Sequence, residues 1–415
     1  MVAARQSVYT LLAAAVLGAL GTALAAAPAA AIPWDRGGAI PAARTPAPLQ
    51  PDPNCTQSYA NDRPRGWPRL RFGIGPRLAG EAGTGQTVPT VPEDGAKADA
   101  ALEALKGRRY FAVRLNRLFM SEGNAGIQEF KRLADRYADL GLDVELQVRY
   151  HPAPADDGDI GKWLEFVRKV VREFGPNEDV TGLQITNEVN VPFSPNTSDG
   201  FYQRATEALV EGVVAAKRES LRLGYTHQRI GFNYAWRFDF IDPANDARFW
   251  ETLGALGGER LRAHTDWVGV DLYPGTFVPG VLVPAPIVDI GDALLEGIAQ
   301  TRECFMPKAG FTMATPLRIE EIGYPTGPGR AEADQLAATR AFVESAHSHR
   351  GTYHITDFRW FNLRDNNSAG PNFQQYFGLL RDDYSPKPAF GAYRELVARY
   401  GASQGLGSSP GRGHG

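Results

Sequence analysis

Two pairs of residues that could do acid–base chemistry stand where apolar runs of the sequence end. The run LQITNEVN (183–190) ends with Asn187 and Glu188, and the run LRIEEIG (317–323) contains Glu320 and Glu321. Cleavage of a glycosidic bond needs two carboxyl groups across one linkage. One is protonated and helps the leaving oxygen depart, and the other is ionised and attacks the anomeric carbon or activates water. Glutamates from two separate runs could supply both groups.

Strand–helix alternation predicts the elements that position these residues. Apolar runs cover residues 70–74, 111–116, 144–150, 183–187, 229–234, 267–273, 317–323 and 358–363. Between and after them, apolar residues recur at helical steps of three and four, as in 127–140, 160–174, 206–223, 330–346 and 388–400. This order indicates parallel strands with helical crossovers. Eight such units over about 340 residues predict an α/β fold, a single (β/α)₈ TIM barrel.

A doubly wound open sheet is the competing fold, and it usually carries a nucleotide-binding loop. The segment GIGPRLAG (73–80) has glycines, but their spacing is not G-x-G-x-x-G, and Pro76 interrupts the turn. We therefore favour the barrel, and no cofactor is expected.

In a barrel, catalytic groups lie where strands end and the following loops begin. The ends of the predicted strands offer carboxylates, aromatic rings that could stack on sugars, and polar groups that could bind hydroxyls. These candidates are Arg114, Asn116, Tyr150, His151, Asn187, Glu188, Trp236, Asp271, Tyr273, Glu320, Glu321, Tyr324, Trp360, Asn362 and Asp365.

Three segments resemble one group of enzymes. TNEVN (186–190) resembles the Asn-Glu at the end of strand four in the retaining (β/α)₈ glycoside hydrolases of clan A, which include cellulase-like enzymes and other β-glycanases. EEIGYPTG (320–327) is similar to their strand-seven signature, and GLLRDDYSPKPAF (378–390) is similar to their closing stretch. The resemblance covers essentially the whole mature chain in element order, and it does not select a family within the clan.

The resemblance implies roles for four of the residues. Glu188 matches the acid/base, and Asn187 matches the amide that holds the substrate 2-hydroxyl. Glu321 matches the nucleophile. Tyr273 matches the aromatic hydroxyl that hydrogen-bonds the nucleophile.

Five further residues are candidates for substrate binding or support. By the same resemblance, Arg114 matches the strand-two arginine that supports the nucleophile, and Trp360 matches the platform under the sugar beside the scissile bond. Tyr150 and His151 stand where other members place a polar aromatic residue or a histidine. Trp236, at the end of the fifth run, is a candidate sugar-stacking residue.

The sequence departs from the family pattern at Glu320, where a small polar residue is usual. Side chains alternate faces along a strand, so only one of Glu320 and Glu321 should point at the sugar. The match to the strand-seven signature selects Glu321. Arg318 shares the parity of Glu320 and is a candidate ion-pair partner for it.

The two ends of the chain lack the strand–helix pattern of the predicted barrel. Residues 1–31 have the order of a secretory signal peptide: a basic start, an apolar middle and an A-x-A-like cleavage site. An uncleaved membrane anchor is the alternative, and the small residues after the apolar run favour cleavage. We expect a Pro/Ala-rich leader at 32–67, the catalytic domain at 68–401 and a disordered tail at 402–415.

Composition and cysteines limit the partners. The formal net charge of −3 gives no reason to expect nucleic acid or a membrane surface as a partner. In an exported chain, Cys55 and Cys304 are expected to form a disulfide, with two free thiols as the alternative. His347, His349 and His354 lack the spacing of a zinc motif, so no metal is expected. We expect a monomer.

These observations predict a secreted, extracellular retaining glycoside hydrolase that cleaves β-type linkages of a polysaccharide or oligosaccharide. In the expected double displacement, Glu321 attacks the anomeric carbon while Glu188 donates a proton, and Glu188 then deprotonates water. Two alternatives stay open: a barrel that binds glycan without cutting it, and a transglycosylase that uses the same residues.

Overall fold

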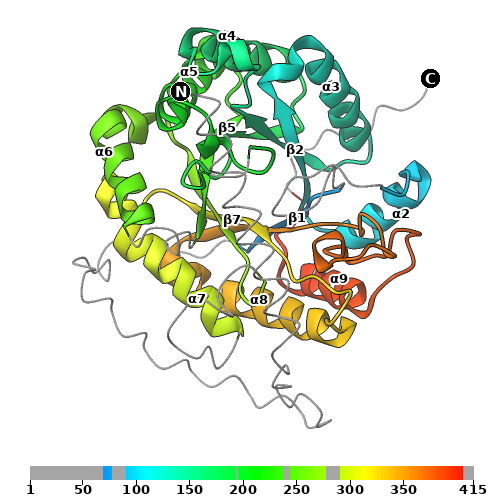
Figure 1. The fold of residues 1–415 in the computed structure, drawn as a ribbon. Helices are drawn as coiled ribbons and strands as arrows, with labels where there is room; N and C mark the ends of the chain where they lie inside the picture. Colours follow the sequence, from blue (N-terminus) through cyan, green and yellow to red (C-terminus); the bar gives the residue numbers. More distant parts are fainter. Residues whose placement is uncertain (1–68, 77–89, 193–194, 237–243, 277–289, 405–415) are drawn as a thin grey trace. The chain divides into compact units, whose positions relative to one another are not determined.

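The computed structural model describes residues 69–76, 90–192, 195–236, 244–276 and 290–404. Their parallel strands close into one barrel in chain order, and the last strand pairs with the first (Figure 1). The predicted (β/α)₈ barrel is thereby confirmed. The strands are β1 (Arg71–Ile74), β2 (Phe111–Phe119), β3 (Asp143–Arg149), β4 (Val180–Ile185), β5 (Arg229–Trp236), β6 (Trp267–Leu272), β7 (Leu317–Ile322) and β8 (Ile355–Trp360).

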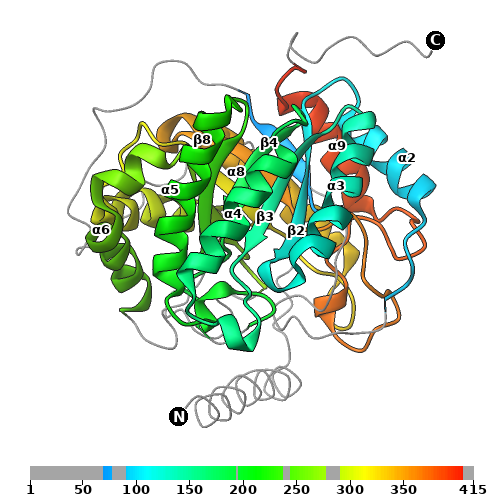
Figure 2. The same cartoon turned by 90° about the horizontal axis from the view of Figure 1, so that it is seen from above.

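Helices surround the strands, as Figure 1 shows, and Figure 2 shows α3, α4 and α5 side by side along one flank. In α4, the Asp159 side chain caps the first turn by accepting a hydrogen bond from the Lys162 amide, and the apolar residues face inward. The helices of the described residues are α2 (Gly95–Lys106), α3 (Gly123–Asp139), α4 (Ile160–Phe174), α5 (Ala205–Leu223), α6 (Asn245–His264), α7 (Ile290–Gln300), α8 (Glu332–Tyr353) and α9 (Pro388–Tyr400).

A layer of charged side chains lines the barrel interior below the C-terminal ends of the strands, around a cavity of about 220 Å³. Arg318 Nη1 lies 2.8 Å from a carboxylate oxygen of Glu145, and Arg359 Nη2 lies 2.7 Å from one of Asp357. Burial alone would raise the pKa of Asp357, but Arg318 and other guanidinium groups hold it well below its usual range. Burial and the neighbouring Glu145 raise the pKa of Glu320 well above its usual range.

The predicted start of the tail at residue 402 does not agree with the backbone contacts of residues 402 and 403. The backbone of Ala402 donates to Leu70 (2.8 Å) and accepts from Tyr110 (2.9 Å), and Ser403 pairs with Arg109. Residues 402 and 403 therefore continue the barrel domain and are not part of a tail. The predicted signal peptide (1–31), the leader (32–67) with its Cys55, and residues 405–415 lie outside the described residues. None of the described helices has the length and apolar character needed to cross a membrane.

Candidate active site

Three carboxyl groups meet at the ends of strands β4, β6 and β7. Glu188 follows β4, Asp271 belongs to β6 and Glu321 to β7, and one oxygen from each lies within 4.8 Å of the others. Asp271 and Glu321 are 1% and 8% exposed, and Glu188 is partly buried. Parallel strands of a barrel end at one rim, which explains why residues so distant in sequence meet here.

The backbone that carries Glu188 leaves β4 in an unusual conformation. Thr186 and Glu188 have φ angles of 64° and 45°, in the left-handed region that side chains disfavour. Hydrogen bonds hold this turn: the Thr186 amide donates to the Val148 carbonyl (2.8 Å), and the Glu188 amide donates to Asn233 Oδ1 (3.0 Å). The turn fixes the direction of the Glu188 side chain. Such conformations cluster at functional sites.

Glu188 lies in an environment that favours its neutral form. Burial, followed by the negative charge of Glu321, raises its pKa to about 8, although Arg149 and Arg114 partly offset this. Burial and the same glutamates also raise the pKa of Asp271 well above its usual range. At neutral pH a proton on Glu188 is therefore available for donation.

Two hydrogen-bond donors hold the carboxylate of Glu321. Its Oε1 accepts from Arg114 Nη1 at 2.6 Å, and its Oε2 accepts from the Tyr273 hydroxyl at 2.7 Å. Arg114 is itself held, because it also donates to Asn116 (2.7 Å) and Gln184 (2.6 Å). The two donors to Glu321 complement a negative charge and fix the carboxylate in place.

A bulge in β7 separates the roles of the two adjacent glutamates. Against β6, Val270 pairs with Ile319 but Asp271 pairs with Glu321, so Glu320 is the extra residue. Both glutamates therefore face the barrel interior, at different heights. Glu320 is 1% exposed and lies in the charged layer, where its Oε1 is 3.8 Å from Arg318 Nη1. Glu321 lies higher, at the rim. The predicted choice of Glu321 agrees with this geometry.

Asn187 is held by a network of side-chain amides. Its Oδ1 accepts hydrogen bonds from Gln147 (2.8 Å), Gln184 (3.1 Å) and Asn233 (2.8 Å). Its Nδ2 donates to the Thr197 carbonyl at 2.7 Å. Since an amide nitrogen carries two hydrogens, one donor of Asn187 is left for another acceptor.

Trp360 does not lie at the site, which corrects the predicted sugar platform. Its side chain is 1% exposed and packs 5.9 Å from the ring of Tyr393 on α9. Side chains alternate along β8, so Trp360 points outward to the helices. The next residue, Phe361, instead lies against Tyr273 (5.8 Å).

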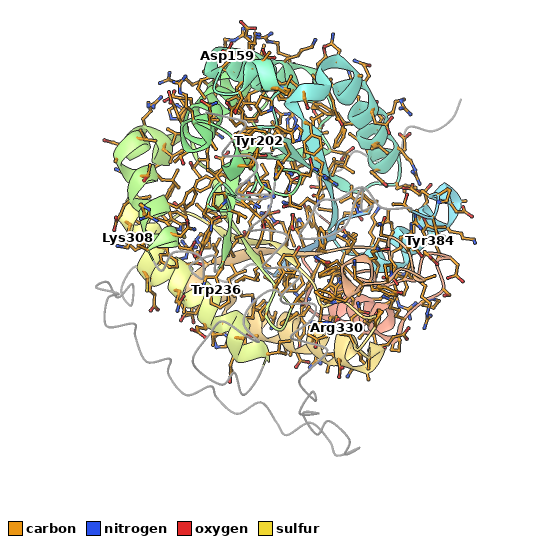
Figure 3. The ribbon with its side chains drawn as sticks, viewed as in Figure 1. Asp159, Tyr202, Trp236, Lys308, Arg330 and Tyr384 are labelled. Carbon is orange, nitrogen blue, oxygen red and sulfur yellow. The ribbon has the colours of Figure 1, made fainter. Side chains whose placement is uncertain are left out.

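Trp236 and Tyr150 are likewise buried under helices. Trp236, labelled in Figure 3, is 2% exposed, and its Nε1 donates to Gln300 of α7 (3.0 Å). The ring of Tyr150 meets Trp163 of α4 edge-on at 5.4 Å, and its hydroxyl accepts from the Gly158 amide (2.9 Å). Neither ring can contact a sugar in this conformation, so both predictions were wrong.

His151 lies nearer the rim. It is partly buried, stacks on Phe119 at 4.2 Å, and its Nδ1 lies 3.1 Å from the Ser121 hydroxyl. The ring of Tyr202, labelled in Figure 3, meets it edge-on at 5.2 Å. Burial lowers the pKa of His151.

Two residues of the site were not assigned a role from the sequence. Asn233 on β5 donates hydrogen bonds to Asn187 and Asp271, and its Oδ1 accepts one from the backbone amide of Glu188. Asp199, in a loop, is fully buried and accepts from Arg149 Nε (2.8 Å) and from the amides of residues 150 and 187 (both 2.9 Å). A polar residue inside an apolar run was the available signal for Asn233. Nothing comparable marks Asp199.

Within the described part of the chain, the three carboxylates form a group that is close enough to hold a metal ion. A divalent ion would need all three ionised, against the raised pKa of Glu188 and Asp271. It would also compete with the Arg114 guanidinium on Glu321. The donor set therefore suits proton chemistry better than a metal.

Solved structures of the same fold provide a comparison. The chain is similar to the family 1 β-glucosidase from Thermotoga maritima (15% identity, TM-score 0.54, 82% of this chain and 99% of that one). It is also similar to GH5_18 from Bifidobacterium longum subsp. longum ATCC 55813 (17%, 0.56, 81% of each chain). A family 39 glycoside hydrolase from Bacteroides cellulosilyticus WH2 shares the fold as well (14%, 0.52, 80% and 64%). At these identities the likeness establishes the fold. No protein-family model and no curated protein matches the sequence.

Proposed function

We propose that the chain is a secreted retaining glycoside hydrolase that cleaves β-linked sugars. The observation that carries this proposal is the pairing of Glu188 and Glu321, whose nearest oxygens lie within 4.8 Å but whose environments differ. The raised pKa of Glu188 favours its protonated form, and Glu321 accepts hydrogen bonds from Arg114 and Tyr273. The glycosidases of the same fold support the assignment.

The geometry supports a double displacement. Glu321 attacks the anomeric carbon while Glu188 protonates the departing oxygen, and Glu188 then deprotonates the water that releases the sugar. In retaining enzymes the two carboxyl groups lie about 5 to 5.5 Å apart, whereas inverting enzymes leave about 6.5 to 9.5 Å for a water. The close approach of the two oxygens favours retention. Secretion rests on residues 1–31 alone.

The proposal is tested with a panel of β-linked polysaccharides, oligosaccharides and 4-nitrophenyl glycosides. Proton NMR of a fresh digest, before mutarotation, should show a first product with the anomeric configuration of the cleaved bond. An inverted product would contradict the role of Glu321. Binding of glycan without any cleavage would favour a non-catalytic barrel, and products longer than the substrate would favour a transglycosylase.

The role of Glu188 has its own test. Glu188→Ala should slow substrates with poor leaving groups most, because good leaving groups need little protonation. Azide should restore turnover of activated substrates, since a small anion can enter the vacated space and attack the glycosyl-enzyme. Equal slowing of all substrates, without rescue, would remove Glu188 from this role.

A further inference from the structure

A bulge in β2 directs an arginine toward the rim of the site. The register of β2 against β3 shifts between Leu115 and Leu118, and Arg117 has a φ angle of 76°. Bulges commonly redirect side chains next to active sites. The Arg117 amide donates to Gln147 Oε1 (3.0 Å), and its Nη2 donates to the Asn196 carbonyl (2.9 Å). Its side chain thus reaches from β2 to the loop that follows Glu188.

The Arg117 guanidinium has no ion-pair partner among the described residues. Its Nε is buried without a hydrogen bond, and its Nη2 donates to a neutral carbonyl. Burial, and then the neighbouring Arg149, lower its pKa to about 10, and Glu122 and Glu321 offset this only in part. Glu321 is already bound by Arg114 and Tyr273. A partly buried cation beside a second cation is costly unless an anion joins it.

Arg149 supplies the second cation. It is 1% exposed, its Nε donates to Asp199 (2.8 Å), and its Nη2 is buried without a hydrogen-bond partner. The guanidinium carbons of Arg117 and Arg149 lie 5.3 and 5.4 Å from the centre of the Phe119 ring, so one ring supports both. Gln147 accepts from both residues, at 3.0 Å and 3.5 Å.

The two arginines contact the loop that follows Glu188. The charge of Arg149 lowers the pKa of Glu188, and the charge of Glu321 raises the pKa of Arg117. The residues that they bind, Asn196 and Asp199, lie in the loop that follows Glu188. Gln147, which accepts from both arginines, donates to Asn187 Oδ1 (2.8 Å), and Asp199 accepts from the Asn187 amide (2.9 Å). The two arginines are therefore one hydrogen-bonded side chain away from Asn187, the residue that precedes Glu188.

We propose that Arg117 and Arg149 recognise an anionic group on the substrate, so that the enzyme acts on an acidic glycan. The group is the carboxylate of a uronic acid or a sulfate ester; both offer the paired oxygens that guanidinium groups bind. This inference rests on the proposed glycosidase function and adds a substrate class to it.

The test compares sugars that differ only in the anionic group. Titration calorimetry measures the binding of glucuronate, galacturonate and glucose 6-sulfate against glucose and galactose. Activity is measured on 4-nitrophenyl β-glucuronide and β-galacturonide against the matched neutral glycosides. The wild-type protein should prefer an anionic member of these pairs by about tenfold or more. The uronates and the sulfate distinguish the two sources of charge.

The variant Arg117→Gln should reduce that preference about tenfold, and Arg117→Lys should restore it only in part because it lacks the planar fork. Arg218→Gln, which removes an exposed charge from α5, is the matched control and should keep the preference. Thermal unfolding confirms that each variant is folded. A wild-type protein that prefers neutral sugars, or an Arg117→Gln variant that weakens both classes equally, would overturn the inference.

The two proposals fail in different ways. Cleavage of neutral glycosides without a preference for anions would leave the glycosidase function in place and refute the acidic substrate. Binding of uronates or sulfated sugars that depends on Arg117, without cleavage of any glycoside, would support the anion site and refute the hydrolase.

Discussion

Removing the charge of Glu321 should lower the pKa of Glu188. The negative charge of Glu321 disfavours ionisation of Glu188, and the nearest oxygens lie within 4.8 Å. At that separation and an effective dielectric constant of about 20, the repulsion is about 3.5 kcal/mol, which corresponds to a pKa change of about 2.5. In Glu321→Gln, Arg114 keeps its positive charge and acts in the same direction. Burial remains, so the pKa of Glu188 should fall from about 8 toward its ordinary range.

Carbon NMR of side-chain carboxyl groups, followed as a function of pH, measures this change without needing activity. Glu188→Gln identifies the resonance, and Glu211→Gln, which breaks the partly buried ion pair with Arg260 away from the site, is the control. An unchanged or higher pKa of Glu188 in Glu321→Gln would refute the electrostatic coupling and with it the division of roles between the two carboxyl groups.

Three further results are expected. The folded-state pKa of Glu188 is raised above its unfolded value, so the stability of the protein should fall as pH rises between about 4.5 and 8. Glu188→Gln should flatten that part of the melting-temperature profile. An identical profile in the variant would contradict this prediction. Tyr273→Phe should lower kcat/KM about 10- to 100-fold, since it removes a hydrogen bond to the charged Glu321; an effect below twofold would contradict this role. Asp199→Ala should cost about 3–5 kcal/mol in urea unfolding because it leaves Arg149 buried without its carboxylate; a cost below about 1 kcal/mol would contradict this account.

The fold and the meeting of Glu188 with Glu321 could be predicted because they depend on local patterns. Apolar runs alternating with helical periodicity specify the barrel, and a glutamate at the end of a run lies at the rim wherever the run ends. The predicted placement of Glu188 and Glu321 at the rim therefore did not depend on accurate strand limits. The Arg114 and Tyr273 contacts to Glu321 were expected from the family resemblance, because Tyr273 directly follows β6 but Arg114 lies in the middle of β2.

The direction of each strand-end side chain could not be predicted in the same way. Parallel strands are buried on both faces, so their sequences do not reveal which residues face the barrel and which face the helices. Trp360 and Trp236 consequently looked like sugar platforms although both face helices. Bulges remove alternation altogether: the extra residue at Glu320 brings two successive glutamates into the interior, and the one in β2 redirects Arg117.

Asp199 illustrates a different limit. It lies twelve residues after Asn187, at the start of a short 3₁₀ helix (Asp199–Phe201), and its importance comes from three donors that the fold brings to it. Long-range contacts of this kind leave no local pattern in the sequence.

Trapping of the covalent intermediate tests the central claim most directly. A 2-deoxy-2-fluoro glycoside with a good leaving group, built on the sugar that the substrate panel selects, should form a stable glycosyl-enzyme, because the fluorine slows its hydrolysis. Peptide mass spectrometry of the digested adduct then locates the sugar. The account predicts a single label on Glu321. A label on Glu320, Asp271 or Glu188, or turnover of the natural substrate with no label at all, would contradict it.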